Sequence, residues 1–389
     1  MGDAALGSHL RDASRTYNDP NALYELGYEL LERGLSGVAA TVLSRTNDLA
    51  PGRPKVLGEL AFALGDVGQS EEVLRVLRGV PELAERDFVL SYMLAFHSIM
   101  TRDMAEAARR LPKLLADAQN AKSTEFPPMA KTIEGILARE DAVRHATRLD
   151  DDDLRGWQFV VNGHFLLHVS PHGEEVMRGR YGYVNDSPAL CHEGIRRLAA
   201  LFDVLDLKPA RVFFLADRAS EALGRAAARE LGIGVSPWPK EGTTSPGLVV
   251  ADDMRAFPRE TLATVLPHAA GQPLWAQARC WTQHGPFAED CATLLYQART
   301  TPWDATMQVD SATKEVQPGK PVEGTPEQLA SRILDARVDT DALADLPELV
   351  SLARAACKMT GEHAPGLVRT KGKRRKCWVE SPVRSNRFL

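Results

Sequence analysis

The sequence PNALYELGYELLER at residues 20–33 recurs in pattern as PKVLGELAFALGDV at residues 54–67 and as FVLSYMLAFHSIMT at residues 88–101. The spacing is 34 residues, and the aligned positions include Leu26, Leu60 and Leu94, then Leu43, Leu77 and Leu111. Apolar residues recur at steps of three and four within each stretch, which predicts amphipathic helices. Because a single helical hairpin cannot bury its apolar face, we expect these hairpins to stack on one another.

This register resembles the tetratricopeptide repeat family, whose unit is a pair of antiparallel helices in 34 residues. The first copy has a Leu–Gly pair at Leu26-Gly27 and a turn glycine at Gly34. Gly68 matches that turn in the second copy, whereas the third copy has Arg102. The resemblance implies a helical solenoid over roughly residues 20–121, with a further helix at about 128–147 capping its open end.

In the family register, the first helix of each repeat lines a concave groove. The residues expected there are aromatic: Tyr24, Tyr28, Phe62, Tyr92 and Phe96. Rings offer a large contact area at little cost in rotamer entropy, which is typical of a surface that binds a peptide. The alternative is that another part of the same chain fills the groove.

Helical and β-rich segments alternate from residue 151 onward, which predicts a mostly parallel sheet covered by helices. We expect strands at 211–216, 233–236, 247–251 and 273–278, and helices at 187–205, 219–231 and 258–267. The pair Asn162-Gly163 between two β-rich stretches predicts a hairpin. The predicted fold class is therefore α plus α/β: a tetratricopeptide-type solenoid followed by a three-layer α/β domain.

Four parts are predicted: the repeat domain with its capping helix at 1–148, the sheet domain at 151–300, a connector with C-terminal helices packed on that domain at 301–368, and a basic tail at 369–389. Residues 301–325 show little periodicity and are expected to form a long connector. Thr325, Pro326 and Gln328 together predict a helix start with a capping box.

Polar residues follow two of the predicted strands. Ligands bind beyond the carboxyl ends of parallel strands, so the candidate ligand-binding residues are Asp217, Arg218, Ser220, Asp252 and Asp253. This outline is similar to type I phosphoribosyltransferases, in which paired acids lead into a Thr–Gly phosphate loop. Residues 254–258 (MRAFP) hold neither glycine nor threonine, so the phosphate cradle implied by that family is absent. A degenerate or unrelated sheet is the alternative.

Arg178 and Arg180 lie in a glycine-flanked segment, RGRYG at residues 178–182. Their forked donors suit a phosphate or a carboxylate, which makes them further candidates for ligand binding. The alternative is that they pair with Glu174 and Glu175 of the same loop.

His164, His168 and His172 recur every four residues. On a strand, residues with this spacing lie too far apart to share a metal ion. Cys191 and His192 are neighbours in sequence, so their side chains are expected to point apart rather than act together. We therefore expect no metal site, cofactor or catalytic residue.

Composition excludes several classes of protein. The chain of 389 residues is 44% hydrophobic and 25% charged with a net charge of −5, and it has no apolar run long enough for a membrane span or a signal-peptide core. Its five cysteines are scattered without a Cys-x-x-Cys pair, which favours a reducing compartment, the cytoplasm.

Residues 369–389 carry eight basic residues and one acidic residue, Glu380. Such a tail could contact nucleic acid or anionic lipid, fold back on the acidic body, or stay solvated. Cys377-Trp378-Val379 interrupts the charges with groups that favour packing, so nucleic-acid binding is possible but not favoured.

Together these features predict an adaptor that binds a protein or peptide in its repeat groove and carries an α/β domain of unknown ligand, with no membrane partner. The alternative is an enzyme with a divergent nucleotide- or phosphoribosyl-binding domain, recruited through the repeats. Because the phosphate loop is incomplete, the enzyme alternative lacks a complete catalytic signature. This favours the adaptor.

Overall fold

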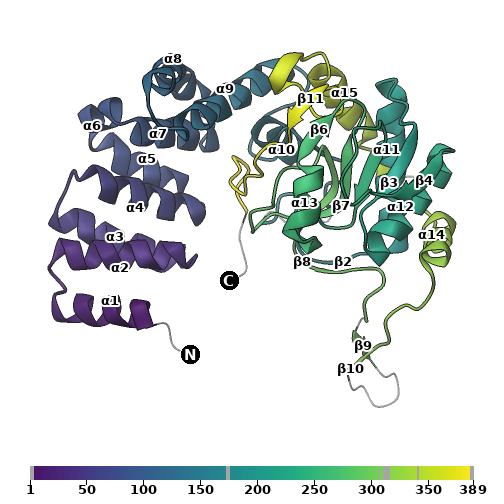
Figure 1. Ribbon diagram of the computed structural model, residues 1–389, viewed down its shortest axis with the longest axis horizontal. Coiled ribbons are helices and arrows are strands. Elements are labelled where there is room, and N and C mark those ends of the chain that lie inside the picture. Colours follow the sequence, from purple (N-terminus) through teal and green to yellow (C-terminus); the bar gives the residue numbers. More distant parts are fainter. Residues whose placement is uncertain (1–3, 172–175, 306, 310–315, 340, 386–389) are drawn as a thin grey trace. The chain divides into compact units, whose positions relative to one another are not determined.

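The computed structural model describes residues 4–171, 176–305, 307–309, 316–339 and 341–385 (Figure 1). The chain divides into two compact units, of which the first ends at Leu137 and the second begins at Ala138. The described residues of the first unit form helices and no strand, and the second unit holds a mostly parallel sheet with helices on both faces, so the α plus α/β class is confirmed. None of the described helices is both long and apolar enough to cross a membrane.

The first unit is a stack of helices, seen side by side in Figure 1. Its elements are α1 (Ala4–Arg15), α2 (Pro20–Glu32), α3 (Ser36–Leu49), α4 (Pro54–Asp66), α5 (Ser70–Arg78), α6 (Pro81–Arg86), α7 (Phe88–Met100), α8 (Met104–Asn120) and the start of α9 (Phe126–Val143). Each of α2 to α5 packs on the next, and α7 packs on α8. The leucine stripes of α2 and α4 are buried, as the periodicity predicts.

The 34-residue repeat is preserved in the backbone of three turns. Gly34, Gly68 and Arg102 have φ angles of 70°, 78° and 65°. Their amides each donate to the carbonyl oxygen three residues earlier at 2.8 Å, and the following amide donates to the oxygen five residues earlier at 2.8–2.9 Å. This is the bond pattern of a Schellman helix end, in which the left-handed residue is usually glycine. The third turn therefore keeps its geometry although glycine is lost.

The second unit is built on a seven-stranded sheet with the order β1-β8-β7-β5-β3-β4, and β2 also pairs with β8. The strands are β1 (Phe165–Leu166), β2 (Tyr181–Asn185), β3 (Arg211–Phe214), β4 (Gly234–Pro237), β5 (Leu248–Ala251), β7 (Leu274–Cys280) and β8 (Cys291–Thr300). All their pairings are parallel.

Two helical layers cover this sheet. Phe213 and Val249 on one face pack with η1 (Met254–Ala256) and α13 (Arg259–Val265). Residues of the opposite face, such as Phe214, lie under α12 (Arg218–Leu231), whose Gly224 is too close to Phe214 to accept a Cβ. Beside α12 lie α11 (Pro188–Val204) and α14 (Pro326–Asp335), and α15 (Leu346–Ala356) packs on α11. Thr325 and Gln328 form the capping box that the sequence predicts for α14.

Two sequence predictions need correction. The hairpin expected around Asn162-Gly163 is instead α10 (Leu154–Asn162), which begins at the Asp153 cap and ends at Gly163 with φ 72°. A left-handed glycine suits a helix end as well as a hairpin turn, so the same dipeptide fits both. The connector contains a small antiparallel ladder of β9 (Met307–Val309) and β10 (Val316–Pro318).

The C-terminal segment adds a strand to the second unit. β11 (Lys371–Lys373) pairs with β6 (Pro267–Ala269), and the buried Arg374 forms an ion pair with Asp290. Arg375 is also largely buried, which lowers its pKa to about 10. The basic charges of this segment thus fold back on the acidic body, one of the alternatives that the sequence leaves open.

Candidate functional site

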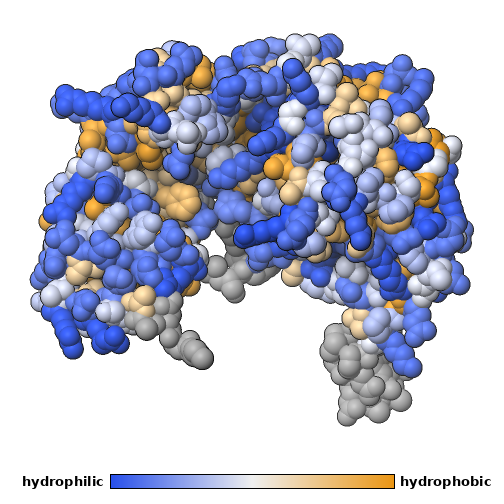
Figure 2. Space-filling view, in the orientation of Figure 1, coloured by the Kyte–Doolittle hydropathy of each residue, from blue (hydrophilic) through white to orange (hydrophobic). Residues whose placement is uncertain are grey.

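Exposed aromatic rings mark one face of the helical unit. Tyr28 on α2 is 40% exposed and Phe62 on α4 is 54% exposed, while Tyr24 is partly buried beside Tyr28 with 6.4 Å between ring centroids. We call these three residues the aromatic face. Where Figure 2 shows the N-terminal helices, their surface is mostly hydrophilic with small hydrophobic areas. Exposed rings that recur on two successive hairpins are typical of a contact surface.

A half-buried carboxylate lies beside these rings. Glu59 is on α4, one turn before Phe62. Burial and then the charge of Glu59 raise the pKa of Tyr24, and the charge of Glu32, burial and the charge of Glu59 raise that of Tyr28. Burial, followed by the nearby charge of Glu32, raises the pKa of Glu59 itself. The face thus combines rings with carboxylates, and sequence reasoning missed the acidic part although Glu59 stands three residues before Phe62.

The other two predicted groove residues do not lie on this surface. Tyr92 and Phe96 on α7 are only 5% and 2% exposed, and their rings stack on each other. The sequence of α7 is apolar around its whole circumference, and such a helix is buried on every side. Packing against α4, α5, α6 and α8 covers α7, so the aromatic face ends at the second hairpin.

The strand-end residues come together at the switch point of the sheet. After β3 the chain moves outward to β4 and then returns to β5 on the other side of β3, where parallel sheets commonly bind ligands. Asp217 caps α12 by accepting from the Ser220 amide at 2.8 Å, and Ser220 Oγ accepts from the Asp252 amide at 2.8 Å. The structure therefore joins three of the five predicted residues, as their positions after neighbouring strands predict.

Arg299 occupies the centre of this edge. Its guanidinium bonds both oxygens of Asp252, at 2.9 and 2.8 Å, and pairs with the buried Asp186 at 2.5 Å. Burial raises the pKa of Asp186, and Arg299 opposes that shift. Gln277 donates to Asp186, while its own Oε1 and Asp217 Oδ2 have no hydrogen-bond partner among the described residues. Asp186 and Arg299 were not predicted, because the pairing of β2 with β8 joins residues 113 positions apart.

The remaining arginines of this edge are also bound. Arg255 donates to Tyr296 Oη at 2.6 Å, and Tyr296 in turn donates to Asp253. Arg218 donates to the carbonyl oxygens of Val322 and Gly324. Within the described part of the sheet edge, these cations are therefore engaged in the fold rather than open to an anionic ligand. A groove of about 740 Å³ elsewhere in this unit, between the end of α9 and α15, is lined by none of these residues.

Arg178 and Arg180 have separate partners. Arg178 donates to Asp152 and to the Asp151 carbonyl oxygen, each at 2.8 Å. Arg180 is buried and donates to the Val383 carbonyl oxygen at 2.9 Å. The predicted alternative partners, Glu174 and Glu175, lie outside the described residues. The two arginines thus do not converge on one site.

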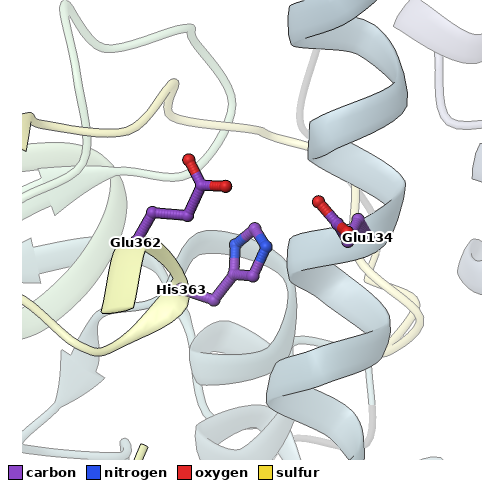
Figure 3. A group of neighbouring side chains, drawn as sticks. All are labelled: Glu134, Glu362 and His363. Carbon is purple, nitrogen blue, oxygen red and sulfur yellow. The ribbon is translucent and has the colours of Figure 1, made fainter. Parts of the chain in front are cut away.

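The predicted histidines do not converge on one site among the described residues. His168 bonds Glu193 and Tyr181, whereas His164 bonds Arg279, and His172 lies outside the described residues. Figure 3 labels Glu362 and His363 on the short turn η3 (Gly361–His363) and Glu134 on α9, which is a residue of the first unit. Two adjacent ligands on one turn leave most of a coordination sphere unfilled. We assign no metal to them.

Comparison with known proteins adds two distant structural likenesses. No protein-family model matches the chain, and no curated protein matches it. A purine phosphoribosyltransferase from Pyrococcus horikoshii is similar over 33% of this chain and 99% of its own, with 11% identity and a TM-score of 0.25. An O-GlcNAc transferase from Thermobaculum terrenum is similar over 72% of this chain and 54% of its own, with 17% identity and a TM-score of 0.21. The chain thus spans about half of that transferase, and neither likeness identifies its activity.

Proposed function

We propose that the protein is an interaction protein that binds a segment of another polypeptide on the aromatic face of its helical unit. The observation that carries this proposal is the exposure of Tyr28 and Phe62 on the first helices of two successive hairpins. A ring removed from water by a partner contributes both area and shape, and aromatic residues often dominate binding energy. The tetratricopeptide-like register of α2 to α5 supports the same function.

A displayed library of random peptides, panned against the full-length protein, tests this function. We expect enrichment of a sequence motif with the wild type and its loss with Tyr28→Ala combined with Phe62→Ala. For each selected peptide, the double variant should weaken binding at least about tenfold, since truncating a central ring costs more than about 1 kcal/mol.

Tyr17→Ala is the matched control, because its ring is 68% exposed but lies outside α2 and α4. It should leave the selected peptides and their affinities unchanged. If the double variant selects the same peptides as the wild type, the aromatic face is not the binding surface.

The enzyme alternative has less support. Asp217 Oδ2 is buried without a hydrogen-bond partner among the described residues, which would suit a polar ligand group at the switch point. However, Arg299 already pairs with both Asp186 and Asp252, and Arg218 and Arg255 are bound to other groups. A phosphate-containing substrate would have to displace these bonds.

A further inference from the structure

Glu59 lacks the cation that several other glutamates of the helical unit have. Glu29 pairs with Arg33, Glu72 with Arg75, and Glu106 with Arg109 and Arg110. Those arginines lower the pKa of Glu72 and, to about 2, that of Glu106. No described lysine or arginine forms an ion pair with Glu59 or Glu32. Burial, followed by repulsion from Glu32, raises the pKa of Glu59 instead of lowering it.

The helices that carry the aromatic face are acidic as a pair. Glu25, Glu29 and Glu32 on α2 and Glu59 and Asp66 on α4 stand against a single basic residue in the two helices, Lys55. Lys55 lies one turn before Glu59 but does not pair with it. A partner that binds here must therefore compensate negative charge as well as cover the rings.

The two tyrosine rings flank this charge. The charge of Glu59 acts on both tyrosines, and Tyr28 also forms a hydrogen bond with Glu32. The planes of the two rings are tilted by only 30° relative to each other. A cation held over such rings is attracted by their negative faces and, at the same time, by the carboxylates. Arginine suits this arrangement better than lysine, because its planar guanidinium stacks on a ring and still offers a fork of donors to a carboxylate.

We propose that the aromatic face binds its partner segment through an arginine side chain, which stacks on Tyr24 and Tyr28 and pairs with Glu59 and Glu32. Phe62, one turn along α4, then contacts an apolar residue of the same segment. This inference rests on the proposed function and names the chemistry of its partner. It assigns charge complementarity as the source of specificity and the rings as the source of contact area.

Peptides selected by the full-length wild type supply the probe. We expect arginine to be enriched at one position of the selected motif. Replacing that arginine by citrulline, its neutral isostere, should weaken binding about tenfold or more, which corresponds to about 1.4 kcal/mol. Glu59→Gln should weaken the arginine peptide by a similar factor and leave the citrulline peptide unaffected.

Glu72→Gln is the matched control, because Glu72 lies on α5, outside the two helices that carry the aromatic face, and pairs with Arg75, so it should not change the affinity. Equal binding of arginine and citrulline peptides, or full affinity in Glu59→Gln, overturns the inference. If the ring variant still abolishes binding in that case, the proposed function stands; if it does not, both fail. If a lysine peptide binds as tightly as the arginine peptide, the proposed stacking of a guanidinium on the rings is wrong.

Discussion

Gly68 shows what a single residue contributes to the repeat. Its φ of 78° lies in the left-handed region, and an added Cβ would meet no atom within 4 Å, so any cost of a side chain comes from the backbone. We expect Gly68→Ala to lower the free energy of unfolding by about 1 kcal/mol, because an L-residue is strained in this conformation. Urea denaturation followed by circular dichroism measures the change.

Gly58 provides the opposite case within the same hairpin. It lies inside α4 with ordinary helical geometry, and an added Cβ there also meets nothing within 4 Å. Gly58→Ala should raise the free energy of unfolding by about 0.5–1 kcal/mol, since glycine is a poor helix former. Effects of the same sign for both variants would contradict the role given to the turn.

At the scale of a helix, burial of α7 makes the fold sensitive to pH. His97 is 1% exposed, its Nδ1 lies 3.0 Å from Ser70 Oγ, and burial lowers its pKa to about 4. The unfolded chain, in which this pKa is near 6.5, binds more protons below neutral pH, so stability falls as the pH decreases through that range. Between pH 7 and 5, wild type should lose about 2 kcal/mol more than His97→Gln. Thermal unfolding monitored by circular dichroism tests this, and equal losses would refute it.

Helices and strands were predictable where local pattern and tertiary environment agree. The capping box of α14 and the alternation of strands and helices from β3 to β7 satisfy this condition, and their bounds differ from the prediction by a few residues. α10 does not, because its apolar, β-branched sequence suits a buried strand equally well. Tyr92 and Phe96 were wrongly placed in the groove because the family register takes no account of the outer face of α7. The sequence of α7 shows that this face is also apolar, which indicates burial.

Contacts between distant segments were the part of the candidate sites that the sequence could not predict. Asp217 and Asp252 were found because they directly follow strands, and the sheet topology places them together. Asp186 and Arg299 meet only through the pairing of β2 with β8. The missing cation beside Glu59 is likewise a property of the packed helices, because nothing in the sequence excludes a pair with Lys55.

The ion pairs of Arg299 make a prediction about the whole second unit, whose sheet they join at β2, β5 and β8. Arg299→Met leaves Asp186 and Asp252 without their cation, and breaking a buried pair in this way costs about 3–5 kcal/mol. Adding Asp186→Asn and Asp252→Asn removes the unpaired charges, so the triple variant should regain much of that stability. Urea denaturation followed by tryptophan fluorescence reports on this unit, because all six tryptophans lie after residue 138. A triple variant less stable than Arg299→Met would show that these carboxylates are held by something other than Arg299.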